Sequence, residues 1–376
     1  MNLNIADAQY GRTPLSWAAE GGHGEVVRKL LERGDINPNT ADTKYSRTPL
    51  LWAAERGHEG VVAMLLKQND VDPNAADTKY NRTPLWWAAR NGYQAISRIL
   101  LERSDINPNK ADTQYGRTPL SWATASGHRE VVRKLLERND INPNIADAQY
   151  GRAPLSWAAE SGHKEVVGKL LERGDINPNT ADTQYGQTPL HWASKSGHEG
   201  VVGVLLKRSD IDPNTADIKY NRTPLWWAAR NGHQAITMIL LQRSDINPNI
   251  ADVQYGRTPL SWAAESGHRE VVRKLLERGD INPNTADTQY GRTPLWWAAQ
   301  RGHEGVVEKL LEQDNVGPNK ADTQYGRTPL VWTASGGHEG VVEKLLERND
   351  TNPNIADAQY GQMPLSWVAK NGHEGW

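Results

Sequence analysis

The sequence predicts an all-α fold, an α-solenoid in which short helix pairs stack along the chain. One observation behind this prediction is a strict period of 35 residues, marked by a tyrosine at every step from Tyr10 to Tyr360. A second is that each repeat holds two short apolar patterns with helical spacing. The third is a loop rich in Asn, Asp and Pro that follows each pair. Such a period is typical of supersecondary units that bury their apolar faces against their neighbours.

The period also predicts the domain organisation. We expect a single repeat domain over residues 1–376, with about ten and a half repeats. Residues 1–9 are the remnant of a preceding repeat, residues 10–359 are ten full repeats, and residues 360–376 are a truncated one. Neither end carries the polar replacements that usually cap a solenoid. We therefore interpret the chain as a segment of a longer protein or as an abbreviated gene product.

The first helix of each repeat is predicted to begin at the Thr-Pro pair. Thr13 is a favourable N-cap, and Pro14 suits the first helical position because its missing amide proton would have no partner there. Leu15 and Trp17 belong to its apolar side, and Gly22 is expected to end it. This helix is therefore short.

The second helix carries an amphipathic stripe. Val26, Val27, Leu30 and Leu31 stand at i, i+1, i+4 and i+5, which is the spacing of one helix face. Gly34, whose counterparts include Asn69, Ser104, Asn139 and Gly174, is expected to end this helix.

A long hairpin-like loop over residues 35–46 follows the second helix. We expect Asp42 and its counterparts to bond the backbones of neighbouring loops and hold the hairpins in register. The pattern Asp35-x-Asn37-x-Asn39 imitates the opening of a calcium loop, but the loop lacks its glycine and its bidentate Glu. Turn capping by Asp and Asn is therefore the favoured interpretation.

Composition excludes several classes of function. The formal net charge is −2, so there is no basic excess for nonspecific nucleic-acid binding. Cysteine is absent, which excludes disulfides and thiol chemistry. No apolar run is long enough to span a membrane, and no signal segment precedes the first repeat, so the predicted location is cytoplasmic.

Candidate catalytic groups are few. Ten histidines from His23 to His373 share one position of the repeat, and only His191 stands apart. A row of this kind places its members a full repeat apart, whereas metal ligands must converge on one ion. We interpret the imidazoles as bonding the turn between helices. The row of tryptophans that begins at Trp17 is interpreted as packing between repeats rather than as an exposed ladder. We therefore predict no enzyme, no metal and no cofactor.

The string Gly-Arg-Thr-Pro-Leu-x-Trp-Ala-Ala-x-x-Gly-His, followed by Val-Val and Leu-Leu, resembles the ankyrin repeat over essentially the whole chain. Each repeat is longer than the usual ankyrin repeat of about 33 residues, with the addition expected around Ala41 and Asp42. The combination Tyr-Gly-Arg-Thr-Pro-Leu-Ser-Trp-Ala-Ala resembles the ankyrin arrays of fungal NACHT-type receptor proteins.

Differences between repeats indicate where a partner could bind. Counting Tyr10 as position 1, positions 7, 11 and 12 lie on one face of the first helix. In ankyrin proteins this face and the loop tips line the concave groove that meets the partner, and the resemblance transfers that role here. The alternative is that surface positions drift without constraint and that Trp86 merely covers its neighbour. The candidate partner-binding residues are Leu51, Glu55, Arg56, Trp86, Arg90, Asn91, His191, Lys195, Trp226, Arg230, Asn231, Trp296, Gln300 and Arg301.

Within this set, we expect Trp86 with Arg90, and Trp226 with Arg230, to stack ring on guanidinium. A basic strip is expected to border them at position 3. It consists of Arg12, Arg47, Arg82, Arg117, Arg152, Arg222, Arg257, Arg292 and Arg327.

The sequence thus predicts an array that binds a protein partner, with no nucleic acid, no membrane and no small-molecule substrate. We expect it to be monomeric or part of a longer chain. The resemblance implies the recognition arm of a fungal immune-receptor-like protein. The alternative is a generic intracellular scaffold or adaptor that tethers a host protein. A nucleotide-binding module encoded in frame before Met1 would favour the receptor arm, and a native start there the scaffold.

Overall fold

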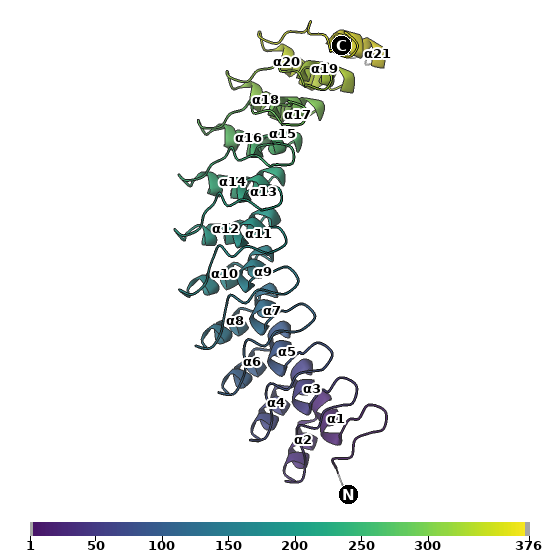
Figure 1. Cartoon of the computed structure of the whole chain (residues 1–376), viewed down its shortest axis with the longest axis vertical. Coiled ribbons are helices and arrows are strands. Elements are labelled where there is room, and N and C mark those ends of the chain that lie inside the picture. The colour runs from purple at the N-terminus through teal and green to yellow at the C-terminus, as the bar shows by residue number, and fades with distance from the viewer. Residues whose placement is uncertain (1–2, 373–376) are drawn as a thin grey trace. The chain divides into compact units, whose positions relative to one another are not determined.

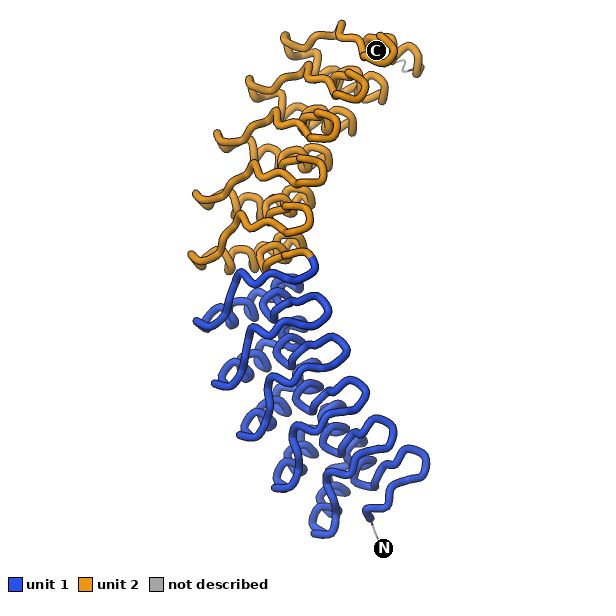
Figure 2. Tube along the Cα trace, in the orientation of Figure 1, with its two compact units in different colours: residues 1–184 blue, residues 185–376 orange. Residues whose placement is uncertain are grey.

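The structure, a computed structural model, describes residues 3–372, so that His373 lies outside the described residues. Over these residues the chain forms 21 α-helices and no strand. It divides into two compact units, residues 1–184 and residues 185–376, and the boundary falls between the fifth and sixth repeats (Figure 2). The prediction of an all-α fold built from stacked helix pairs is confirmed.

Unit 1 contains five helix pairs (Figure 1). First helices pack on the first helices of the next repeat, and second helices pack on second helices. The bounds are α1 (Pro14–Glu20), α2 (Gly24–Leu31), α3 (Pro49–Arg56), α4 (Glu59–Leu66), α5 (Pro84–Asn91), α6 (Gln94–Leu101), α7 (Pro119–Ala125), α8 (Arg129–Leu136), α9 (Pro154–Glu160) and α10 (Lys164–Leu171).

Unit 2 contains five further pairs, stacked in the same way, and a last first helix. The bounds are α11 (Pro189–Ser196), α12 (Glu199–Leu205), α13 (Pro224–Arg230), α14 (Gln234–Leu241), α15 (Pro259–Glu265), α16 (Arg269–Leu276), α17 (Pro294–Gln300), α18 (Glu304–Leu311), α19 (Pro329–Gly336), α20 (Glu339–Leu346) and α21 (Pro364–Asn371).

The helix ends follow the sequence signals with one exception. Thr13 caps α1 by accepting a hydrogen bond from the Ser16 amide at 3.2 Å, and Gly22 lies just past the helix with φ of +72°. Helix α2 ends at Leu31, so the end predicted at Gly34 is wrong. The second helix of the next repeat, α4, also ends early, at Leu66, and the chain then turns so that Val71, the counterpart of the half-buried Ile36, enters the core with 2% exposure.

The buried aspartate at position 33 closes its own hairpin. The Asp42 carboxylate accepts hydrogen bonds from the Tyr45 amide at 2.7 Å and from Trp52 Nε1 at 3.2 Å. The prediction that this side chain bonds a neighbouring loop is wrong for Asp42. Neighbouring hairpins are instead joined through the backbone, where the Thr43 amide donates to the Tyr10 carbonyl at 3.0 Å.

Side-chain amides of asparagine join the Asn-rich loops that follow the second helices of consecutive repeats. Asn39 Nδ2 donates to the Asp70 carbonyl at 2.6 Å, while its Oδ1 accepts from the Asp72 amide at 3.2 Å. The Asn39 amide in turn donates to Asn37 Oδ1 at 2.9 Å, which is the turn capping expected of these residues. The same clamp between loops recurs at Asn74, Asn109, Asn144, Asn214, Asn249, Asn284 and Asn319.

Candidate functional site

The predicted site residues at position 7 are not on the surface. Each is fully buried, so none can contact a partner while the array is folded. The prediction of a partner-binding role is wrong for these five residues, which are Leu51, Trp86, His191, Trp226 and Trp296, all 0% exposed.

Their burial has a common cause, which is the first helix of the next repeat. The Trp86 ring packs edge-on against Trp122 with ring centroids 5.4 Å apart, and its Nε1 donates to the Asp112 carboxylate at 3.1 Å. His191 is held in the same way, because its Nε2 lies 3.0 Å from the Arg222 carbonyl. A large side chain at position 7 therefore joins two repeats.

Positions 11 and 12 lie at the end of the first helix and remain accessible. Arg56, Asn91, Asn231 and Arg301 are exposed, and Glu55, Arg90, Lys195, Arg230 and Gln300 are half-buried. Ion pairs hold some of them across repeats: Arg56 Nη2 lies 2.9 Å from Glu20, and Arg301 Nη2 lies 2.9 Å from Glu265. For these nine residues a role in partner binding stays a prediction.

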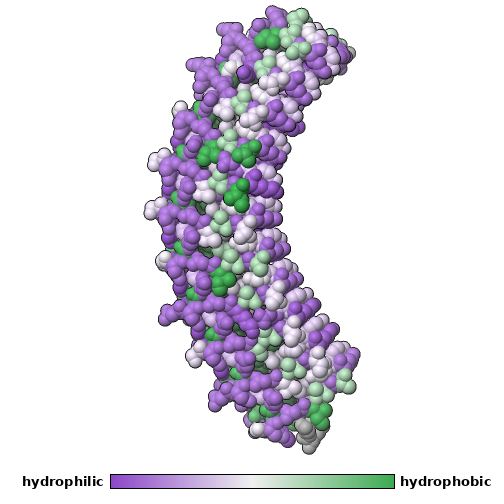
Figure 3. Space-filling view, in the orientation of Figure 1, coloured by the Kyte–Doolittle hydropathy of each residue, from purple (hydrophilic) through white to green (hydrophobic). Residues whose placement is uncertain are grey.

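The expected stacking of position 11 on position 7 is present. The Arg90 guanidinium lies 5.4 Å from the Trp86 ring centroid and 5.0 Å from that of Trp122. Arg230 lies 5.3 Å from Trp226. On the face shown in Figure 3, hydrophilic residues cover much of the surface, and strongly apolar residues lie in small separate patches.

The arginines at position 3 do not form a surface strip. The Arg117 guanidinium lies 4.7 Å from the Trp122 ring centroid and 3.5 Å from that of Trp157 in the next repeat. Arg257 lies between Trp262 and Trp297 in the same way, at 4.8 Å and 3.5 Å. The prediction of a basic strip is therefore wrong. Cation–π contacts hold Arg117 and Arg257 between the position-8 tryptophans of adjacent repeats, which pack between repeats as predicted.

The histidines at position 14 have a structural role. His58 Nε2 lies 2.8 Å from the Glu20 carbonyl at the end of the preceding first helix, and His268 Nε2 lies 3.0 Å from the Arg230 carbonyl. The predicted bond to a turn is present, but it crosses to the preceding repeat. Among the residues the structure describes, no three His, Cys, Asp or Glu side chains are grouped to hold a metal ion.

One of these histidines makes stability depend on pH. Burial lowers the pKa of His268 below its ordinary value. The unfolded chain therefore binds a proton first as the pH falls, and the contribution of His268 to stability is present above its unfolded pKa and lost as the pH falls through the folded pKa. Replacing His268 with Tyr, which the third repeat carries as Tyr93, is expected to reduce the drop in urea midpoint between about pH 7.5 and about pH 5.5. If the urea midpoint of His268→Tyr falls as much between these two pH values as that of the original chain, the proposed contribution of His268 to the pH dependence is wrong.

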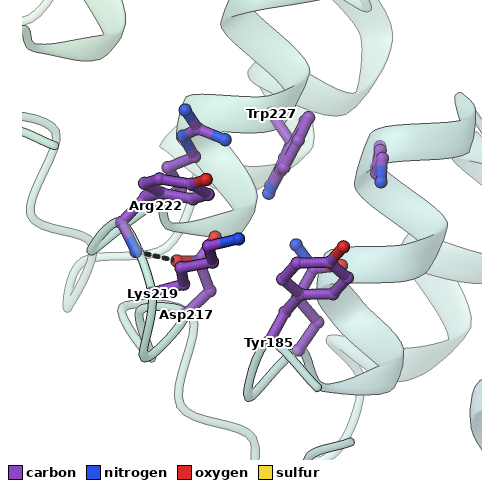
Figure 4. Close-up of a pocket in the computed structure, with 8 residues that line it drawn as sticks. Tyr185, Asp217, Lys219, Arg222 and Trp227 are labelled. Atoms are coloured by element: carbon purple, nitrogen blue, oxygen red, sulfur yellow. Dashed lines mark hydrogen bonds between the residues drawn. The ribbon is translucent and has the colours of Figure 1, made fainter. Parts of the chain in front are cut away.

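A cavity of about 210 Å³ lies between the sixth and seventh repeats, within unit 2 (Figure 4). It is bounded by the hairpins that precede α11 and α13, by Lys195 near the end of α11 and by Trp227 in α13. Its lining residues are Tyr185, Gln187, Lys195, Asp217, Lys219, Tyr220, Arg222 and Trp227.

Comparison with known proteins agrees with this architecture. A family model for ankyrin repeats in three copies matches residues 1–77, 69–147, 142–217, 212–287 and 282–357. The chain belongs to the ankyrin-repeat family. No curated protein matches it significantly. The matching family is a family of interaction modules rather than of enzymes.

The ankyrin array lacks any helix, within residues 3–372, that is long and apolar enough to cross a membrane. The cavity is the feature that sequence reasoning missed. Its signal is the break in the row of arginines at position 3, where Gln187 replaces Arg, together with the change of Glu to Lys195 at position 11.

Proposed function

We propose that this chain binds a protein partner through the exposed ends of its first helices in each compact unit. Ankyrin arrays are generally protein–protein interaction modules. The observation that carries the proposal is that positions 11 and 12 stay accessible while their charge varies, from Glu55 and Arg56 to Arg90, Lys195 and Arg230. The frame beneath them is constant, so the differences lie where a partner could contact them.

Binding through these residues requires little ordering. Arg56 and Arg301 are already held by ion pairs to the preceding repeat, and Arg90 and Arg230 already lie against indole rings. A side chain that is ordered before the partner arrives loses less conformational entropy on binding. Arginine is also among the residues enriched at energetically dominant contacts.

For the cellular setting, the recognition arm of a fungal NACHT-type, immune-receptor-like protein in the cytoplasm is our first proposal, supported by the Tyr-Gly-Arg-Thr-Pro-Leu-Ser-Trp-Ala-Ala motif. A generic scaffold or adaptor is the second. An in-frame nucleotide-binding module upstream in the source gene distinguishes them.

Replacing Arg56, Arg90, Arg230 and Arg301 together with alanine is expected to weaken partner capture from the source cell at least about tenfold. The melting temperature should change by only a few degrees, because the exposed ion pairs of Arg56 and Arg301 contribute about 0–1 kcal/mol each and the ring contacts of Arg90 and Arg230 about 0.5–1 kcal/mol each.

The matched control removes four cations from the second helices and their ends, Lys67, Arg98, Arg129 and Lys207, all exposed. This control variant should still capture the partner. Equal capture by both variants would show that the first-helix ends are not the interface.

A further inference from the structure

The arginines at position 3 differ in their polar contacts, and the difference follows the residue at position 11 of the same repeat. Where position 11 is Glu, the guanidinium forms an ion pair with its carboxylate. The pairs are Arg12 with Glu20, Arg47 with Glu55, Arg152 with Glu160 and Arg257 with Glu265. Where position 11 is Arg or Gln, the guanidinium donates to the glutamine at position 35. These pairs are Arg82 with Gln114, Arg222 with Gln254 and Arg292 with Gln324.

Two arginines of this row have neither contact. Within residues 3–372, the side chains of Arg117 and Arg327 form no hydrogen bond and no ion pair, although these residues are only 9% and 7% exposed. Position 11 of their repeats is occupied by the short side chains of Ala125 and Ser335. A guanidinium has only donors and no acceptor, so burying it without acceptors is costly. The fourth repeat is the clearer of the two cases, because complete repeats flank it on both sides.

The eighth repeat shows what the fourth repeat lacks, because a block of four repeats recurs 140 positions apart along the chain. Arg257 is the counterpart of Arg117. Each guanidinium lies between two indoles at nearly the same distances, 4.7 Å and 3.5 Å for Arg117 and 4.8 Å and 3.5 Å for Arg257. Arg257 Nη1 also donates to the Glu265 carboxylate at 2.7 Å, whereas Ala125 stands at the equivalent position of the fourth repeat. Arg117 therefore has the same ring contacts without the carboxylate.

A short residue at position 11 coincides with a more exposed indole. Trp122 is half-buried, whereas its counterpart Trp262 is 8% exposed. Trp332, in the repeat of Arg327, is half-buried as well, and the other tryptophans at position 8 are buried except Trp17 in the first repeat. Trp122 and Ala125 stand at i and i+3 of α7, on one face of the helix, so a methyl group leaves open the surface that a longer side chain covers. The result is an opening over Trp122 at the accessible end of α7.

The carboxylates around Arg117 are already engaged. Asp147 and Asp112 both act on its charge, but both are buried and accept hydrogen bonds from other groups. Asp147, for example, accepts from the Tyr150 amide at 2.7 Å and from Trp157 Nε1 at 2.8 Å. Burial still lowers the pKa of Arg117, so these carboxylates do not offset its desolvation. Of its side-chain nitrogens only Nε is fully enclosed, and the two terminal nitrogens can therefore donate to an anion from solution.

We propose that the opening over Trp122 in the fourth repeat binds a carboxylate, the side chain of an Asp or Glu that the protein partner presents, and that Arg117 is its hydrogen-bond donor. The carboxylate takes the place that Glu265 has in the eighth repeat. The site lies at the end of a first helix, on the surface assigned to partner binding above. This inference deepens the proposed function and rests on it for the protein nature of the ligand.

The charges around the opening select against other occupants. A cation would be repelled by Arg117 and by Arg90, whose guanidinium lies 5.0 Å from the Trp122 ring centroid. A neutral amide offers an acceptor but leaves the charge of Arg117 unmatched, so it binds more weakly. A free phosphate ion shares the chemistry of a carboxylate toward a guanidinium, and it is therefore one arm of the test.

The test is a titration of the whole chain with capped glutamate, N-acetylglutamate N-methylamide, at constant ionic strength, followed by the indole N–H resonances of isotope-labelled tryptophan. The Trp122 signal is assigned by its loss in Trp122→Phe. Capped glutamate should shift this signal to saturation and leave the Trp262 signal in place. Capped glutamine should bind at least about tenfold more weakly. Equal binding of capped glutamine, or tighter binding of inorganic phosphate, would overturn the proposal.

Matched variants follow from the other repeats. Ala125→Glu supplies the carboxylate that four other repeats carry at position 11, so it should fold, bury Trp122 and lose capped-glutamate binding. Arg117→Gln introduces the residue that the sixth repeat carries at position 3, and it should also lose this binding. Glu265→Ala should open a second site, reported by the Trp262 indole. Retained binding in either of the first two variants, or a silent Trp262 signal in the folded third variant, would overturn the proposal.

The probe titration does not depend on partner capture, so the two proposals fail separately. If capped glutamate does not bind, this inference fails and capture through the first-helix ends is unaffected. If the alanine variant of those ends still captures the partner, the proposed function fails, although the opening over Trp122 binds its probe. Full partner capture by Ala125→Glu would overturn the assignment of the carboxylate to the partner.

Discussion

Replacing Trp226 with alanine is expected to lower the free energy of unfolding by about 3–5 kcal/mol, the usual cost of truncating a buried tryptophan. The ring is 0% exposed and packs edge-on against Trp227 and Trp262, with centroids 4.8 Å and 5.2 Å apart. Its Nε1 also lies 3.4 Å from the Asp252 carboxylate. Truncation therefore removes contacts within the seventh repeat and between the seventh and eighth repeats. Because each repeat depends on its neighbours, the loss weakens their coupling.

The measurement is urea unfolding followed by far-ultraviolet circular dichroism, with Arg230→Ala as the matched control. Arg230 stacks on the same ring from a half-buried position, so its removal should cost only about 0.5–1 kcal/mol. An unchanged midpoint for Trp226→Ala would mean that the ring is accessible, and it would restore position 7 to the candidate interface.

The sequence predicts the fold well because each signal for it is local and is repeated ten times. Thr13 and Pro14 determine where a helix begins through their own backbone chemistry, and the two valines and two leucines of the second helix define its apolar face. These signals act within one repeat and do not depend on contacts with the neighbouring repeat. The sequence predicts the end of α2 wrongly because the early turn is a tertiary effect. It depends on the burial of residues equivalent to Ile36 in other repeats, such as Val71.

The candidate site was harder to predict because helical spacing shows which side chains share a face but not what covers that face. Trp86 and Arg90 do lie on one face, yet the next repeat covers the helix start and leaves its end accessible. The prediction that the arginines at position 3 form a surface strip is wrong for a related reason. A charged residue is usually exposed, but Arg117 lies between two indoles that come from different repeats.

Replacing Asp112 with alanine should have a comparably large effect, because this one buried carboxylate completes four hydrogen bonds. Its Oδ2 accepts from Trp86 Nε1 and Trp122 Nε1, each at 3.1 Å. Its Oδ1 accepts from the Gln114 amide at 2.9 Å and the Tyr115 amide at 2.7 Å. Hydrogen bonds to a charged group contribute about 1.5–3 kcal/mol each, so we expect a loss of about 3 kcal/mol or more.

Asparagine substitutions at two equivalent positions isolate the contribution of the bonds between repeats. Asp112→Asn keeps an acceptor for the hairpin amides but turns Oδ2 into a donor that faces two indole N–H groups, so it should still be clearly destabilising. In the preceding repeat, Asp77 Oδ1 accepts from the Tyr80 amide at 2.6 Å, while its Oδ2 has no hydrogen-bond partner. Asp77→Asn should therefore cost much less, as measured by the urea midpoints of both variants. Equal losses would mean that the carboxylate acts only within its own hairpin, and that the indole bonds from Trp86 and Trp122 contribute nothing to the coupling of the repeats.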